Sequence, residues 1–378
     1  MTTSSKGTTG FAARTKKAAI TVAIALLSTG AMSPAAAEPV DDTQFLLVGG
    51  TVSGDVTVLR VESGGGLTKV GQTPVGLGVM SLALAPNGRH VYVTQAGEQR
   101  VTGFQIDYAG ALRPIPGAAV DIGGGVPITS TLSTDGSLLF VAVGGVPGHI
   151  RTYSVDPSGA LTQIASISVP GFSTIPMIRI DPDGRFLRFV SPFDSLISSF
   201  SIGPDGTLTP IGAPVSGGAL PVNPGYTPDG RFVYVSNELG GNISGYSIGP
   251  DGQLTPTPGS PYASALMPHG AEVTADGARV YVPVVAGGGV AGYSIGEDGA
   301  LAALPGSPYP APPGSGPGTL VLSDDERHVY AADVLTTGIT TRVHTYDVRP
   351  DGTLTLSTLP SVDTGTVLGD GPIMVLTP

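Results

Sequence analysis

The decapeptide "SIGPDGTLTP" at residues 201–210 returns with a single change, as "SIGPDGQLTP", at residues 247–256. Its Gly-x-Leu element occurs seven times, and the leucines follow one another at intervals of 45–53 residues: Leu67, Leu112, Leu161, Leu208, Leu254, Leu301 and Leu354. A second element, "PDGRFVYV" in its clearest form, precedes most copies by about 20 residues. Such a chain is expected to fold by stacking copies of one small structural unit.

Each unit predicts four short β-strands. Runs rich in Val, Ile, Tyr and Phe alternate apolar and polar residues, which is the period of half-buried strands. Asp-Gly pairs separate the runs, and these residues tolerate the positive φ that tight hairpins need. In the unit at 177–214 the strands are "MIRIDP", "RFLRFVS", "LISSFSI" and "LTPIGAP". Seven four-stranded units of this length predict an all-β chain folded as a seven-bladed β-propeller.

The two ends of the chain divide one unit between them. The first unit keeps a second strand, "QFLLVGG" at 44–50, without a first strand before it. The last segment, "GPIMVLTP" at 371–378, is a first strand without a second. Pairing the two antiparallel would complete the seventh blade from both termini and leave no open edge in the ring. We therefore expect one propeller domain over residues 44–378.

The first 37 residues have the pattern of a secretory signal peptide. Basic residues precede the apolar run "AAITVAIALLSTGAM", and small residues, "SPAAA", follow it. This arrangement predicts a Sec-type signal cleaved after Ala37, a linker over residues 38–43 and an extracellular protein. The apolar run is too short to span a bilayer comfortably, so we expect no membrane insertion.

Charge and composition exclude several classes of function. The whole chain has a net charge of −11; residues 38–378 alone hold 14 Lys and Arg against 29 Asp and Glu, a net charge of −15, with Lys69 the single lysine. Such a surface argues against nucleic acid or anionic membranes as partners. With no cysteine, disulfides and thiolate catalysis are excluded. No calcium-loop, P-loop or zinc motif occurs, so we expect no metal or cofactor. We also expect a monomer.

Antiparallel order divides the loops between two faces of the predicted ring. The Asp-Gly hairpins after strands one and three share one face, whereas the loops after strands two and four, which vary in length and sequence, share the other. Variable loops on a rigid scaffold are where binding residues usually lie. We therefore expect a small-molecule site on the second face, at the mouth of the central channel.

His269 is the sharpest candidate at this mouth. Alignment by the Asp-Gly turn places it at the start of an inner strand, where the other units hold Met80, Ile128, Pro176, Val222, Gly318 and Pro372. A lone His among apolar neighbours can keep a near-neutral pKa and act as a general base, or it can simply be held by a backbone carbonyl. Glu238, in "VSNELGGNISGY", is either its partner acid or a solvated loop carboxylate.

Further polar residues fall at equivalent positions around the ring. Asn223 is the only amide one position after the His269 slot. Four residues before the aromatic of each third strand, the polar candidates for binding a substrate are Arg100, His149, Asn242 and Arg342. Asn223 or Arg100 would polarise a substrate carbonyl. His90 and His328 occupy a slot that Phe186 and Phe232 fill in other units, which indicates a structural role.

The units "TPDGRFVYVSNELGGNISGYSIGPDGQL" and "PHGAEVTADGARVYVPVVAGGGVAGYSIGEDGAL" resemble the seven-bladed lactonase family, which includes the propeller 6-phosphogluconolactonases and carboxymuconate cyclases. The resemblance covers residues 44–378. It implies a site built from a His in a "PH" motif, a Glu in "NEL" and an Arg in "GPRH". His269 and Glu238 match the first two, whereas Val222 and Asn223 stand where the arginine motif would be.

Two functions follow from these observations. The first is a secreted, lactonase-like hydrolase that binds and opens a small, neutral or weakly charged cyclic ester, with His269 activating water and Glu238 orienting it. The second is a non-catalytic extracellular propeller with "YVTN"-like repeats, whose mouth binds a ligand or a protein. The distance between His269 and Glu238 distinguishes the two, because only neighbours can share in one reaction.

Overall fold

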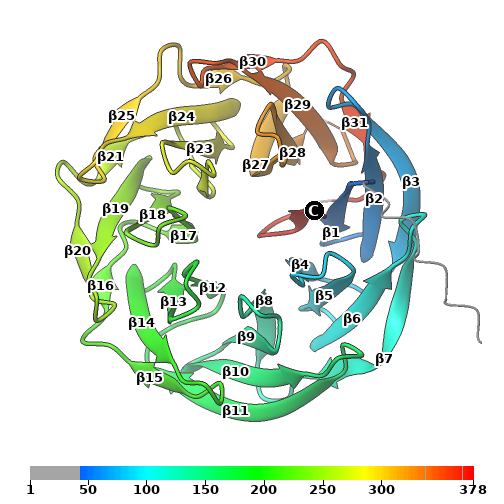
Figure 1. Ribbon diagram of the computed structural model, residues 1–378, viewed down its shortest axis with the longest axis vertical. Helices are drawn as coiled ribbons and strands as arrows, with labels where there is room; N and C mark the ends of the chain where they lie inside the picture. Colours follow the sequence, from blue (N-terminus) through cyan, green and yellow to red (C-terminus); the bar gives the residue numbers. More distant parts are fainter. Residues whose placement is uncertain (1–42, 337, 368) are drawn as a thin grey trace, which may run out of the picture. The chain divides into compact units, whose positions relative to one another are not determined.

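The computed structural model describes residues 43–336, 338–367 and 369–378. Within them, seven antiparallel sheets are arranged in a ring around a central axis, each with its first strand innermost (Figure 1). The predicted all-β, seven-bladed propeller is confirmed. The predicted signal peptide and all of the predicted linker except Thr43 lie outside the described residues.

The strands of the first three blades follow one another from the inside outwards. Blade 1 consists of β32 (Met374–Leu376), β1 (Phe45–Gly50), β2 (Asp55–Val61) and β3 (Leu67–Pro74). Blade 2 consists of β4 (Val79–Leu84), β5 (His90–Gln95), β6 (Arg100–Ile106) and β7 (Leu112–Asp121). Blade 3 consists of β8 (Val126–Leu132), β9 (Leu138–Gly144), β10 (Gly148–Val155) and β11 (Leu161–Val169).

In the other four blades the outer strand is split into two short pieces that pair with the same third strand. Blade 4 consists of β12 (Met177–Ile180), β13 (Phe186–Ser191), β14 (Leu196–Ile202), β15 (Leu208–Pro210) and β16 (Val215–Ser216). Blade 5 consists of β17 (Pro221–Tyr226), β18 (Phe232–Asn237), β19 (Asn242–Ile248), β20 (Leu254–Pro256) and β21 (Tyr262–Ala263). Blade 6 consists of β22 (Glu272–Val273), β23 (Arg279–Val284), β24 (Gly289–Ile295), β25 (Leu301–Ala303) and β26 (Tyr309–Pro310). Blade 7 consists of β27 (Ser315–Leu322), β28 (His328–Thr336), β29 (Arg342–Val348), β30 (Leu354–Leu356) and β31 (Val362–Asp363).

Prolines lie at several of these breaks, although β7, with Pro114 and Pro116, stays continuous. Segments such as "LTPIGAPVS" and "LTPTPGSPYA" place prolines within the outer strand, where their missing N–H groups interrupt the hydrogen-bond ladder. Edge strands tolerate such breaks, which also make them poor templates for pairing with another chain.

The two chain ends close blade 1 as predicted. β32 pairs antiparallel with β1, with Leu47 opposite Val375. The ends are further tied by hydrogen bonds between Phe45 and Thr377, one from the Phe45 N–H to the threonine Oγ1 (2.8 Å) and one from the Thr377 N–H to the Phe45 carbonyl (2.9 Å). Ile373 and Met374 are buried in the cluster that joins blades 7, 1 and 2. The ring therefore depends on contacts between residues more than 300 positions apart.

The core lies between blades rather than at one centre. Among the residues that the structure describes, buried apolar side chains form six clusters, and each of these joins neighbouring blades. At one edge of each interface, the Gly-x-Leu glycine has a φ between 78° and 89°. A Cβ there would collide with the residue that opens the second strand of the preceding blade, for example Phe232 opposite Gly299 at 2.4 Å. His90 and His328 fill this slot against Gly159 and Gly65, in agreement with their predicted structural role.

We call the face with the Asp-Gly hairpins the turn face. The opposite face, which carries the loops after strands two and four, is the mouth face. In the described part of the chain, no helix has the length and hydropathy needed to cross a bilayer.

Candidate functional site

His269 lies at the mouth face, just before β22. Its backbone N–H donates to the Pro283 carbonyl (2.9 Å), and its side chain is buried, with 7% exposed. The ring Nδ1 lies 2.6 Å from the carbonyl oxygen of Gly318 and must donate to it, because a carbonyl only accepts. The proton on Nδ1 is thereby fixed, and Nε2 is the nitrogen left to face other groups.

Two carboxylates converge on His269 Nε2. Glu238 Oε1, from the loop after β18, lies at 3.1 Å, and Asp370 Oδ1, from the loop before β32, lies at 3.3 Å. The Glu238 side chain is nearly buried, with 14% exposed, whereas that of Asp370 is 55% exposed. Thus loops from blades 5, 6 and 1 bring three ionisable groups together. The structure places His269 and Glu238 as neighbours, which was the arrangement that favours chemistry.

This geometry decides the charge of the imidazole. Burial by itself lowers the pKa of His269, but hydrogen bonds to Asp370 and Glu238, together with their charges, outweigh it and raise the pKa to about 10. The same hydrogen bond to His269 lowers the pKa of Asp370. At neutral pH the site therefore holds an imidazolium between two carboxylates, with a net charge of −1.

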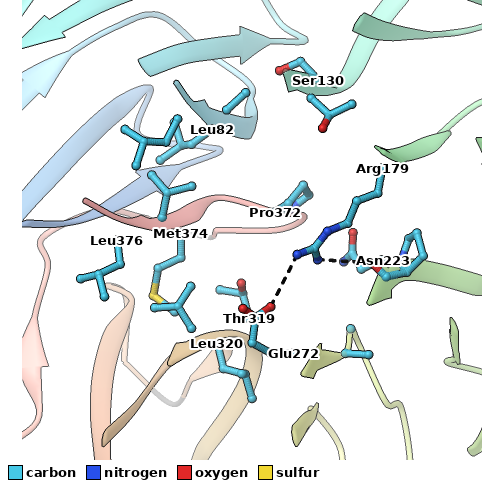
Figure 2. A pocket seen from close by; sticks show the side chains of 18 of the residues that line it. Leu82, Ser130, Arg179, Asn223, Glu272, Thr319, Leu320, Pro372, Met374 and Leu376 are labelled. Carbon is cyan, nitrogen blue, oxygen red and sulfur yellow. Dashed lines mark hydrogen bonds and ion pairs between the residues drawn. The ribbon is translucent and has the colours of Figure 1, made fainter. Parts of the chain in front are cut away.

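His269 also borders a cavity of about 580 Å³ at the centre of the ring, lined by the inner strands of all seven blades. Most of its wall is apolar or carries small hydroxyl groups, as with Leu82, Ser130 and Thr319. Figure 2 shows one charged belt in this wall, where Arg179 extends from β12 towards Asn223 and Glu272. A cavity of this size and polarity suits a small molecule rather than a polymer.

The charged belt joins three adjacent blades. Arg179 Nη1 donates to the Pro224 carbonyl (3.2 Å), and its Nη2 lies 3.8 Å from Glu272 Oε2. Burial raises the pKa of Glu272, and the charge of Arg179 opposes that rise. The pair leaves guanidinium N–H groups with capacity to donate to a ligand.

Asn223 lies beside this belt because of an irregularity in β17. The register of β17 against β18 shifts between Val222 and Gly225, and Asn223 has a φ of 39°. Such a bulge re-aims a side chain, and here it turns Asn223 into the cavity wall. Its Cβ also lies 3.6 Å from where a side chain on Gly270, next to His269, would begin.

The four remaining predicted binding residues do not line the cavity. They belong to third strands, two strands away from the axis: Arg100, His149, Asn242 and Arg342. Arg100 forms an ion pair with Asp121 (2.7 Å). Asn242 accepts from Asn237 and donates to Gly240 within its own turn. A position at the mouth-face end of a strand is therefore not enough to bring a residue to the channel.

Three residues of this region were not selected from the sequence. For Asp370, the Gly-Asp-Gly-Pro context just before an inner strand was the available signal. Arg179 and Glu272 stand at the same offset from the Asp-Gly turn in two units, where other units hold small or apolar residues. Opposite charges at equivalent inner positions were the signal for the belt.

A second histidine–carboxylate pair is enclosed in blade 7. His344 Nε2 lies 2.9 Å from Asp333 Oδ2, and its Nδ1 lies 2.6 Å from Ser361 Oγ. The side chains of His344 and Asp333 are 1% and 0% exposed, so no substrate reaches them. Among the residues that the structure describes, no group of three or more His, Asp or Glu side chains is placed to hold a metal ion.

Comparison with solved structures shows how widely this architecture occurs. The chain is similar to the periplasmic gluconolactonase PpgL of Pseudomonas aeruginosa (20% identity, TM-score 0.71, 89% of this chain and 99% of that one). It is also similar to a Bacteroides fragilis protein proposed to be a 6-phosphogluconolactonase (19%, 0.74, 92% and 100%). A protein from Lactobacillus plantarum matches over 89% of this chain and 100% of its own (17%, 0.72). At these identities the likeness shows the fold.

Comparison of sequences identifies the family as well as the fold. No curated protein matches the chain significantly. The family model described as lactonase, 7-bladed β-propeller, matches residues 45–174, 168–267 and 197–369. These matches span all seven blades and include His269 and Glu238. The chain therefore belongs to the lactonase family of seven-bladed β-propellers.

Proposed function

We propose that this protein is an exported lactonase that opens a small, neutral cyclic ester at the mouth of its channel, acting as a monomer without metal or cofactor. One observation carries the proposal: His269 is held between Glu238 and Asp370 at the edge of the central cavity. The family, and the gluconolactonase among its structural neighbours, support a lactone as the substrate. The signal-peptide pattern supports export.

The geometry assigns the roles differently from the general base expected for His269. Asp370, the more exposed carboxylate, accepts a proton from water as the water oxygen attacks the ring carbonyl carbon. The Nε2–H of His269 forms a hydrogen bond to the developing oxyanion, and this proton is transferred to the ring oxygen as the C–O bond breaks. Glu238 holds the imidazolium in place. The proton taken up by Asp370 returns to His269, so one water and one lactone give one hydroxy acid.

The test measures hydrolysis of a panel of lactones by a purified protein of residues 38–378. A pH-stat records the acid that each reaction releases. His269→Gln, Glu238→Gln and Asp370→Asn should each lower kcat/KM by about 10²–10⁴-fold, the usual contribution of acid–base groups. The matched control is His149→Gln, a histidine of the mouth face outside the cavity, which should change kcat/KM less than about twofold. Equal losses in the control and the site variants would contradict the assignment.

The pH profile separates the two roles of His269. An imidazolium acid predicts activity that falls as pH rises towards about 10, where His269 loses its proton, and that falls again at low pH as Asp370 is protonated. A general base with an ordinary histidine pKa predicts activity that rises through about pH 6.5 and stays high. The activity above about pH 8, after subtraction of the uncatalysed rate, therefore decides whether His269 acts as an acid or as a base.

The second candidate function is non-catalytic ligand binding. It is favoured by one specific observation, that both ring nitrogens of His269 are already hydrogen-bonded. Lactone binding that depends on His269 without any turnover would select this alternative.

A further inference from the structure

Large apolar side chains are exposed mainly around the mouth. In the described residues thirteen such side chains are exposed, and nine of them lie on the mouth face: Val52, Leu77, Val126, Val146, Phe172, Phe193, Leu239, Leu266 and Ile339. We call these nine the apolar rim. The turn face has one, Tyr108, and three lie on outer strands. Single exposed apolar residues are ordinary, but their gathering on one face marks a binding surface.

The rim has a fixed aromatic pair over blades 3 and 4. Phe172 and Phe193 meet edge to face, with ring centroids 6.2 Å apart, although they are 50% and 53% exposed. The Phe172 N–H donates to Asp194 Oδ2 (2.6 Å), and a β-bridge between Gly145 and Ser173 ties the adjoining loop. The loops thus hold these rings in the solvent, where burial by a ligand would be favourable.

Two further rim residues are close in sequence to the residues of the histidine site. Leu239 follows Glu238 in the chain and is 75% exposed, and Leu266 lies three residues before His269 and is 68% exposed. Their loops are joined by a hydrogen bond from the Ser264 N–H to the Gly241 carbonyl (2.9 Å). An apolar group attached to a ligand at His269 would therefore have an apolar surface beside it.

The charges at the mouth do not favour an anion. His269 with Glu238 and Asp370 carries a net −1, and Arg179 is paired with Glu272 (3.8 Å). Arg100, a cation of the same face, is already paired with Asp121. A phosphate or carboxylate on the ligand would meet net negative charge, whereas an uncharged ligand would not.

We propose that the substrate is an uncharged lactone with an alkyl or aryl substituent, and that Leu239, Leu266 and the Phe172–Phe193 pair bind this substituent. The proposal rests on the lactone-opening site described above and adds its specificity. The ester ring lies at His269, and the substituent extends over the rim. Burying each added CH₂ is worth a factor of up to about four in affinity.

The experiment measures kcat/KM for δ-lactones whose alkyl substituent grows from one to eight carbons, beside gluconolactone and its 6-phosphate. We expect kcat/KM to rise by about two- to fourfold per CH₂ until the rim is covered. The double variant Leu239→Ser, Leu266→Ser should flatten this rise, and Tyr108→Ser, an exposed aromatic of the turn face, should not. A flat series, or a preference for the phosphorylated lactone, would overturn the proposal.

A second readout keeps the specificity independent of turnover. Alkyl δ-lactams resist hydrolysis, so their Kd values report on the rim even in a protein that opens no lactone. Failure of all lactones to react, with chain-length-dependent lactam binding, would overturn the proposed reaction and retain the rim. The protein could instead bind neutral phosphatidylcholine vesicles and lose this binding in the double variant, which would assign the rim to a lipid surface. Lactam binding that is independent of chain length would exclude the alkyl site.

Discussion

The turn face and the mouth face are built from loops of the same seven units, yet they differ in how closely the copies follow one another. On the turn face all seven Gly-x-Leu glycines share one conformation, with φ between 78° and 89°. On the mouth face the loops differ, and of the six described non-glycine residues with positive φ five lie on that side of the ring, including Asn223 in β17 and Met267. Backbone strain gathers at functional sites when the rest of the fold can support it. Regular loops hold this ring together, and irregular loops carry the proposed site.

The largest expected effect comes from removing the element on which both faces depend. Deleting residues 371–378 would remove β32, expose the edge of β1 and lose the buried Ile373 and Met374, at about 1.5–3 kcal/mol each. A typical fold is stable by only about 5–15 kcal/mol. We expect the loss of cooperative thermal unfolding by circular dichroism. Deleting only the exposed Pro378 is the control, and an unchanged melt in the longer deletion would contradict ring closure.

A pair of glycine substitutions compares the faces directly. Gly299→Ala on the turn face would combine left-handed strain with a clash against Phe232 at 2.4 Å, each costing about 1–3 kcal/mol. Gly241→Ala on the mouth face has a φ of 56° but no atom within 4 Å, so only the strain remains. Urea unfolding should show the larger loss for Gly299→Ala. Equal losses would mean that the packing between blades does not distinguish the faces.

A smaller effect is expected from the hydrogen bonds that cross from blade to blade on the turn face. The Tyr234 hydroxyl donates to the Gly299 carbonyl (2.9 Å), and Tyr92 and Tyr281 make the same bond to Gly159 and Gly352. Tyr234→Phe should lower the free energy of unfolding by about 1 kcal/mol. In Tyr330, at the equivalent position, the hydroxyl has no partner among the described residues, so Tyr330→Phe should be close to neutral. An equal loss of unfolding free energy in both variants would show that the hydrogen bond is not the cause.

The contrast between the faces also explains what could be predicted from sequence. Seven copies of one pattern report the same strands and turns repeatedly, so the blade count, the closure by 371–378 and the structural role of His90 were accessible. The match of His269 and Glu238 to family motifs brought two neighbours together correctly. These features depend on local spacing or on a repeated motif.

The rest depends on geometry that no repeat encodes. Arg100 and His149 lie at the mouth-face ends of their strands, yet these are third strands, two positions outward from the axis. Asp370 reaches His269 only because ring closure places the last loop beside blades 5 and 6. The charge of the imidazole depends on distances of 2.6–3.3 Å to three acceptors, and spacing in the sequence does not contain those distances.

The central claim is that His269 is an imidazolium held by two carboxylates, and its titration tests this most directly. The chain has five histidines, so the His269 signals can be assigned in an ¹⁵N imidazole spectrum by comparison with His269→Gln. We predict that His269 stays protonated through pH 8 and titrates near pH 10. The stability that its raised pKa contributes should be complete below about pH 6.5 and should be lost as pH rises towards 10. A midpoint at or below 6.5 would show a neutral imidazole at physiological pH and contradict the account.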